Sequence, residues 1–194
     1  MEDKRLAILL ACRHLLEEGH KITMDKVAVV AGVAKGTVYL YFESKQELIM
    51  QTFIASIEEI SDVMHQTAVS STGTSFDRLT AMVEVHYEMV RGKMLLLQRL
   101  FSTEPGIFRR PVAGPPLVVM RAIERVQACY IDVLTDGIKC GEFRPHNTQI
   151  IATAIMAVIQ NFSVGDIYWP HDNQGKVIGE LLQFVLQGIT LHGL

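Results

Sequence analysis

The sequence is poor in the features that mark secreted, membrane-spanning and metal-binding proteins. It has three cysteines among 194 residues, Cys12, Cys129 and Cys140, and no two of them form a C-x-x-C pair. We therefore predict neither a disulfide framework nor a zinc site, and expect free thiols in a reducing cytoplasm. The apolar run at 150–159 is too short to cross a bilayer, which needs about 20 residues. These absences favour a cytoplasmic protein without a membrane partner.

An excess of charge of one sign is also missing. Residues 1–50 hold seven Lys or Arg and seven Asp or Glu, and the whole chain has a formal net charge of -3. A nucleic-acid-binding domain usually carries a basic excess, so the electrostatic evidence for a nucleic-acid-binding function is weak. Binding through a few well-placed cations remains open. It would favour a dimer, because each subunit would make few phosphate contacts.

No stretch of the chain alternates between apolar and polar residues in the way that predicts a β-strand. Apolar residues instead recur at spacings of three and four, which predicts an all-α fold of about nine helices. Gly92 predicts a break between two of them, and the proline- and glycine-rich segment 103–116 predicts a loop. The predicted helices span 3–18, two short stretches within 23–42, then 44–70, 76–90, 94–101, 117–140, 148–166 and 173–191.

The segment from Ile22 to Ile49 predicts two short helices around a tight turn, followed by the capped start of a third. Thr23 can cap the first helix, and Gly32 can adopt the positive φ of a sharp turn. Ser44 and Glu47 form the pattern of a capping box. An outward face that carries a lysine, a threonine and tyrosines suits phosphates and base edges, which predicts a helix-turn-helix. The residues of that face are Lys35, Gly36, Thr37, Tyr39, Leu40 and Tyr41.

The same segment resembles the TetR family of bacterial transcriptional regulators. The resemblance lies in AGVAKGTVYLYF at 31–42 and SKQEL at 44–48, and it covers about a quarter of the chain. It implies a DNA-binding domain at 1–49, which a long helix joins to a ligand-binding and dimerisation domain at 50–194. Ala34 stands where the family often has Ser or Thr, so the second short helix lacks a side-chain cap. The residues implied in DNA binding are Thr23, Lys35, Gly36, Thr37, Tyr39, Leu40, Tyr41 and Lys45.

The rest of the chain is rich in methionine and aromatic residues, and its predicted helices also carry a few polar side chains. Each such residue alone fits core packing better than ligand binding. Together they suit an apolar cavity with a few convergent polar groups, and the resemblance implies an inducer pocket in this part of the chain. Lipophilic aromatics, cationic drugs and acyl chains would all suit it. The candidate ligand residues are Met82, His86, Met89, Phe101, Phe108, Met120, Gln127, Tyr130, Met156 and Asn161.

The last two predicted helices are apolar on more than one face. A surface helix needs only one apolar stripe, so the second face requires a partner. Burial within the chain is one explanation. We prefer a homodimeric four-helix bundle, because a lone helix-turn-helix needs a second copy for affinity.

These patterns predict a ligand-responsive, DNA-binding transcriptional regulator. We expect a dimeric repressor that an apolar or aromatic small molecule releases from a palindromic operator. One alternative is a DNA-binding regulator without an effector, and another is a small helical enzyme that uses His86, Tyr87 or a cysteine. We predict no catalytic residues, no metal site and no cofactor, because no nucleophile–base or metal-ligand spacing occurs.

Overall fold

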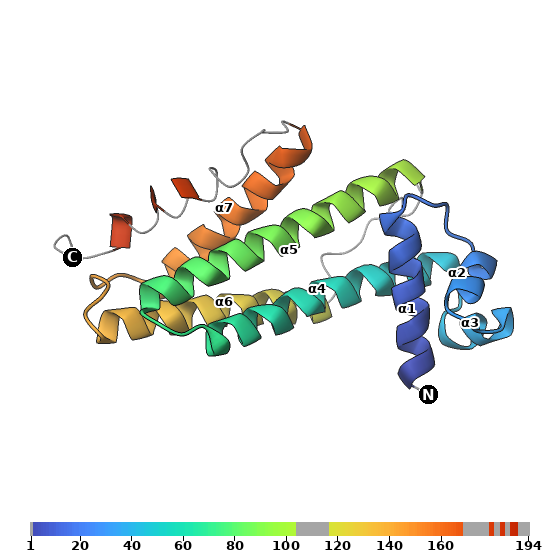
Figure 1. Cartoon of the computed structure of the whole chain (residues 1–194), viewed down its shortest axis with the longest axis horizontal. Coiled ribbons are helices and arrows are strands. Elements are labelled where there is room, and N and C mark those ends of the chain that lie inside the picture. Colours follow the sequence, from blue (N-terminus) through green and yellow to red (C-terminus); the bar gives the residue numbers. More distant parts are fainter. Residues whose placement is uncertain (1, 104–116, 169–178, 181–182, 185–186, 190–194) are drawn as a thin grey trace. The chain divides into compact units, whose positions relative to one another are not determined.

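The structure is a computed structural model that describes residues 2–103, 117–168, 179–180, 183–184 and 187–189. In these ranges every regular element is helical, which confirms the all-α prediction. The predicted loop at 103–116, apart from Thr103, and most of the predicted helix at 173–191 lie outside the described residues. The helices, shown in Figure 1, are α1 (Glu2–Glu17), α2 (Met24–Val30), α3 (Lys35–Tyr41), α4 (Lys45–Ser70), α5 (Ser75–Thr103), α6 (Leu117–Lys139) and α7 (Thr148–Tyr168).

One boundary prediction was wrong. Helix α5 continues through Gly92, where we expected a break. A glycine inside a helix costs about 0.5–1 kcal/mol relative to alanine. Val90 and Lys93 are buried on either side of Gly92, so the packing of their side chains offsets that cost. Tertiary burial, which a local pattern does not show, keeps the helix intact.

The chain divides into two compact units. Unit 1 comprises Met1–Glu58 and Leu95–Val119, and unit 2 comprises Glu59–Met94 and Met120–Leu194. Both α4 and α5 continue from one unit into the other. The functional division into residues 1–49 and 50–194 stays a prediction.

In unit 1, helices α1 to α3 and the start of α4 enclose a single apolar core (Figure 1). Burial raises the pKa of the Cys12 thiol to about 11, against an opposing hydrogen bond to Thr52, so this thiol stays neutral. Gly19 follows α1 with a φ of 74°, as a helix-ending residue does. The largest contributors to this core are Ile8, Leu16, Ile22, Phe42, Leu48 and Ile49.

In unit 2, the later part of α4 packs with α5, α6 and α7 around a second core. Polar contacts tie these helices together. Lys93 of α5 pairs with Glu59 of α4 at 2.9 Å, and Arg125 of α6 lies 3.4 Å from Asp62 of α4. Arg78 of α5 donates to the carbonyl of Ala68 near the end of α4. Helix α4 is thus held by cations from both neighbouring helices of this unit.

Candidate nucleic-acid interface

The turn between α2 and α3 forms from local signals. The Thr23 hydroxyl accepts a hydrogen bond from the Lys26 N–H at 3.2 Å and caps α2. Gly32 has a φ of 66°, which lets the chain reverse direction before α3. Ala34 stands at the N-cap of α3 without a side-chain hydrogen bond, as predicted. Val38 is buried, so this side of α3 is held against the core of unit 1.

The opposite side of α3 faces solvent. Leu40 is 84% exposed and Tyr39 is 49% exposed, so both side chains are accessible to a partner. Lys35 and Gly36 are exposed as well. Thr37 and the remaining candidates for DNA contact, Thr23, Tyr41 and Lys45, are half-buried.

Two of these half-buried candidates also have structural roles. Tyr41 packs against the core of unit 1, and the Thr23 hydroxyl is used as a cap. A hydroxyl that accepts one hydrogen bond can still donate to a phosphate oxygen, so a second role for Thr23 remains compatible with its geometry. All eight residues stay candidates for DNA contact.

Charged side chains around α3 form contacts that the sequence did not predict. The Lys35 ammonium lies 2.9 Å from Oδ1 of Asp25 on α2. Arg5 of α1 donates to the Gln51 side chain at 3.3 Å, and its guanidinium lies 5.7 Å from the centroid of the Phe42 ring. The helical positions of Asp25 and Lys35 were predictable, but the packing of two short helices that brings them together was not.

Two side-chain hydrogen bonds cap the start of α4. The Ser44 hydroxyl accepts from the Glu47 N–H at 3.1 Å, and the Glu47 carboxylate accepts from the Glu43 N–H at 2.7 Å. The predicted caps therefore form, and the chain between α3 and α4 is fixed by side-chain hydrogen bonds.

Among the candidate ligand residues, the structure brings three together inside unit 2. Nδ1 of His86 lies 3.1 Å from the Tyr130 hydroxyl, which in turn lies 3.4 Å from the Met82 carbonyl. All three residues are buried. Burial lowers the pKa of His86 to about 4 and raises that of Tyr130, so both groups are neutral at pH 7. They form a polar pair in an otherwise apolar core.

The other ligand candidates lie elsewhere in unit 2 or cannot be placed. Met89 and Met156 are half-buried against the same core, whereas Met120 and Asn161 are exposed. Gln127 donates to Thr153 of α7 at 2.8 Å and so links α6 to α7. The side chain of Phe101 and all of Phe108 lie outside the described residues.

Surface hollows of the described part of the chain include one in each unit. One, of about 320 Å³, is in unit 1 between the end of α1 and the outer side of α2, where Val29 and Val30 are exposed. The other, of about 400 Å³, follows the outer face of α7. Neither hollow is lined by a predicted ligand residue.

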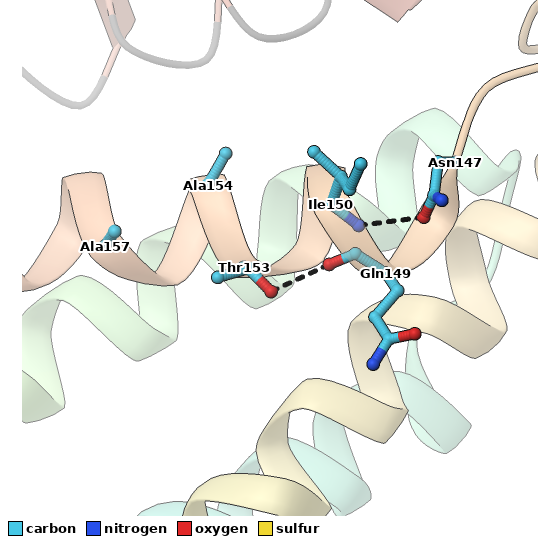
Figure 2. Close-up of a pocket in the computed structure, with 6 residues that line it drawn as sticks. All are labelled: Asn147, Gln149, Ile150, Thr153, Ala154 and Ala157. Carbon is cyan, nitrogen blue, oxygen red and sulfur yellow. Dashed lines mark hydrogen bonds between the residues drawn. The ribbon is translucent and has the colours of Figure 1, made fainter.

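The hollow on α7 is lined by residues of this helix and its cap alone. Figure 2 shows Ile150 and Ala154 pointing away from α6, on the side opposite the Gln127–Thr153 link. Asn147 caps the helix by accepting from the Ile150 N–H at 3.0 Å. The lining residues are Asn147, Gln149, Ile150, Thr153, Ala154 and Ala157.

The described residues contain no group of three or more His, Cys, Asp or Glu side chains that could hold a metal ion. None of the helices placed by the structure is long and apolar enough to span a membrane.

Comparison with known proteins identifies the first unit. Residues 8–51 match the family model described as bacterial regulatory proteins, tetR family. The chain is 23% identical over 155 residues to the fatty acid metabolism regulator protein of Bacillus subtilis, and the matched region covers 74% of each protein. It is 24% identical over 200 residues to the transcriptional activator FasR of Mycolicibacterium smegmatis, which covers 97% of this chain and 84% of that one.

The fold extends this similarity over almost the whole chain. The crystal structure of FadR from Bacillus subtilis in complex with stearoyl-CoA matches with a TM-score of 0.69 at 19% identity. The match covers 94% of this chain and 98% of that one. A capped α2, a glycine turn, an exposed α3 face and these matches lead to one conclusion: the chain carries the DNA-binding domain of the tetR family at residues 8–51 and is a DNA-binding transcriptional regulator.

Proposed function

We propose that the protein is a dimeric repressor that reads a palindromic operator with α3 and leaves it when an acyl chain or acyl thioester binds in unit 2. The observation that carries the DNA-reading part is the exposed face of α3, where Tyr39 and Leu40 face solvent beside Lys35. An α-helix fits the major groove, where a leucine can contact a thymine methyl and a tyrosine can hydrogen-bond a base or phosphate. Thr37 and Gly36 complete the proposed contact face.

The outer face of α7 supports the dimer. Ile150 is 63% exposed, and Ala154 and Ala157 follow it on the same helix. Helix α7 is apolar around most of its circumference, although one stripe suffices for contact with α5 and α6. Small side chains let a second helix approach closely, so a second copy of the chain is our proposed occupant. Dimerisation would place two copies of α3 about one turn of DNA, ~34–36 Å, apart or at a multiple of that distance.

The core of unit 2 supports an amphipathic effector. Met82 and the half-buried Met89 and Met156 can adapt to the shape of an acyl chain. The neutral pair of His86 and Tyr130 can hydrogen-bond a carbonyl oxygen within that apolar region. The named ligand of the FadR structure, stearoyl-CoA, combines an acyl chain with a thioester carbonyl. We therefore favour acyl compounds over the aromatic and cationic compounds that the sequence also allowed.

The DNA-reading part is tested by selecting bound duplexes from random DNA and then measuring fluorescence anisotropy with the selected operator. Leu40→Ala and Tyr39→Ala should each weaken operator binding by about 5- to 150-fold per subunit, the equivalent of one lost base contact in each subunit. Leu10→Ala is the matched control, because Leu10 is an exposed leucine of α1 outside the proposed interface. Unchanged operator affinity in both α3 variants would reject the proposed contact face.

The dimer is tested by light scattering after size-exclusion chromatography. Ala157→Glu places a charge on the outer face of α7 and should convert the dimer to monomer. Val69→Glu is the control, since Val69 is an exposed apolar residue of α4 outside that face. An Ala157→Glu variant that remains fully dimeric would exclude this surface.

The effector is tested by adding acyl-CoA of increasing chain length to the protein–operator complex, with CoA alone and the free fatty acids in parallel. Acyl-CoA should release the operator, and operator DNA should weaken acyl-CoA binding by the same factor, as linkage requires. Release by free fatty acids alone would assign the carboxylate form. Operator binding that none of these compounds changes would reject the acyl effector and leave the DNA-binding assignment standing.

A further inference from the structure

The contact between Asp25 and Lys35 links the two helices of the helix-turn-helix. The Lys35 ammonium lies 2.9 Å from one Asp25 carboxylate oxygen and 3.1 Å from the other, so both oxygens accept from it. Asp25 lies in the first turn of α2 and Lys35 is the first residue of α3. Both side chains are largely exposed, which leaves the pair open to competing ions and to a phosphate.

The ion pair engages Lys35, one of the few basic residues in the first fifty positions of the chain. The first fifty residues have equal numbers of basic and acidic residues, so DNA affinity depends on few ammonium and guanidinium groups. The hydrogen bond and charge of Asp25 raise the pKa of Lys35, which means that the ammonium is already stabilised by a carboxylate before DNA arrives. A phosphate oxygen would need the same donor hydrogens.

We propose that Asp25 is an intramolecular competitor of the DNA backbone for Lys35 and thereby limits both affinity and salt dependence. The inference rests on the proposed Lys35–phosphate contact. Binding of DNA exchanges one ion pair for another: the ammonium leaves a carboxylate and joins a phosphate. An exposed ion pair contributes little, so the exchange occurs readily, but it reduces the gain from the phosphate contact by about 1.5- to 5-fold per subunit.

The exchange also predicts how salt affects binding. A lysine that joins a phosphate releases about one counterion from DNA, which steepens the dependence of log K on log salt by about 0.9. When the same lysine must first leave Asp25, salt also weakens that exposed ion pair, so the competition fades as salt rises and the dependence of log K on log salt becomes shallower. Asp25→Asn removes the competitor, so the full counterion release should become visible.

The experiment measures binding of the full chain to its selected operator and to a shuffled duplex by anisotropy, over a range of salt concentrations. The variants are Asp25→Asn, Lys35→Gln and the double variant. Asp25→Asn should strengthen binding to both duplexes by about 1.5- to 5-fold per subunit at low salt and steepen the slope of log K against log salt by about 0.2 to 0.7 per subunit, because this gain fades as salt screens the ion pair. Lys35→Gln should weaken binding to both, and Asp25→Asn should add no more than a small gain to it.

A matched control separates competition from general repulsion. Glu17→Gln removes one acidic charge, the carboxylate that accepts from Arg13 at 2.8 Å within α1, and should leave the salt slope unchanged. Thermal unfolding followed by circular dichroism establishes that each variant is folded. An equal gain from Asp25→Asn with and without Lys35 would mean that Asp25 only repels DNA, and that result overturns the inference.

Different results would reject the Lys35–phosphate contact and the competition by Asp25. If Lys35→Gln binds both duplexes as tightly as the unmodified chain, the proposed Lys35–phosphate contact is absent. If Lys35→Gln weakens binding while Asp25→Asn leaves affinity and salt slope unchanged, the contact stands and the competition does not. Weaker binding by a folded Asp25→Asn variant would show that Asp25 orients Lys35 toward DNA, which is the opposite of the proposed role.

Discussion

Buried His86 should make the stability of the protein depend on pH in a defined window. Burial lowers the pKa of His86 from its ordinary 6.5 to about 4, so the unfolded chain binds a proton between these values and the folded chain does not. Stability is therefore complete above pH 6.5 and falls as the pH drops toward 4. One pKa unit corresponds to 1.36 kcal/mol, so the loss between pH 7 and pH 4.5 is about 2 kcal/mol from this residue alone.

The assay is urea unfolding followed by circular dichroism at pH 7 and pH 4.5, at one fixed protein concentration. His86→Gln cannot take up the proton, and its amide can still bond the Tyr130 hydroxyl. On acidification from pH 7 to pH 4.5, the unfolding free energy of the original chain should fall by about 2 kcal/mol more than that of His86→Gln. His65→Gln removes an exposed histidine and serves as the control. If the curves of the original chain and His86→Gln stay parallel over this range, the argument from burial is refuted.

Three further predictions concern packing and capping. Gly137→Ala should destabilise the chain by about 1–3 kcal/mol in urea unfolding, because the added Cβ would overlap the buried Phe143 ring; a neutral effect would mean that the ring moves aside. Ser44→Ala should cost about 1 kcal/mol of stability by removing the α4 cap, and an unchanged melting temperature would contradict it. Ala34→Ser supplies the cap that α3 lacks and should slow amide hydrogen exchange in α3; unchanged exchange rates would show that its order does not depend on the cap.

The helix-turn-helix was predictable because residues close together in the sequence determine its geometry. Thr23 caps α2, Gly32 takes the positive φ of the turn, and Ser44 caps α4, each within a few residues of the backbone groups that it satisfies. Such contacts do not depend on where distant segments lie. The same holds for Asn147 at the start of α7.

The errors and omissions concern contacts that only the folded chain creates. Helix α5 continues through Gly92 because Val90 and Lys93, on either side of this glycine, are buried by helices far away in the sequence. The pairing of Asp25 with Lys35 depends on the angle at which two short helices pack. Which methionines face a shared interior depends on the helix register, so Met82 lies deep in the core while Met120 is exposed. Periodicity identifies an apolar face but not the element that covers it.

The contacts of α4 suggest how an event in unit 2 can reach the DNA-reading segment. Lys93 has an 8% exposed side chain and reaches Glu59, while Arg125 reaches Asp62 one turn further along α4. Separating this ammonium from the Glu59 carboxylate, which is 42% exposed, costs stability because the Lys93 side chain has little access to water, so the ion pair favours movement of Lys93 and Glu59 together. An effector that displaces α5 would then pull on α4 through this pair. Helix α4 is continuous, and Ser44 caps its first turn. Unwinding of α4 at its N-terminal end could absorb such a displacement only if the cap at Ser44 were lost.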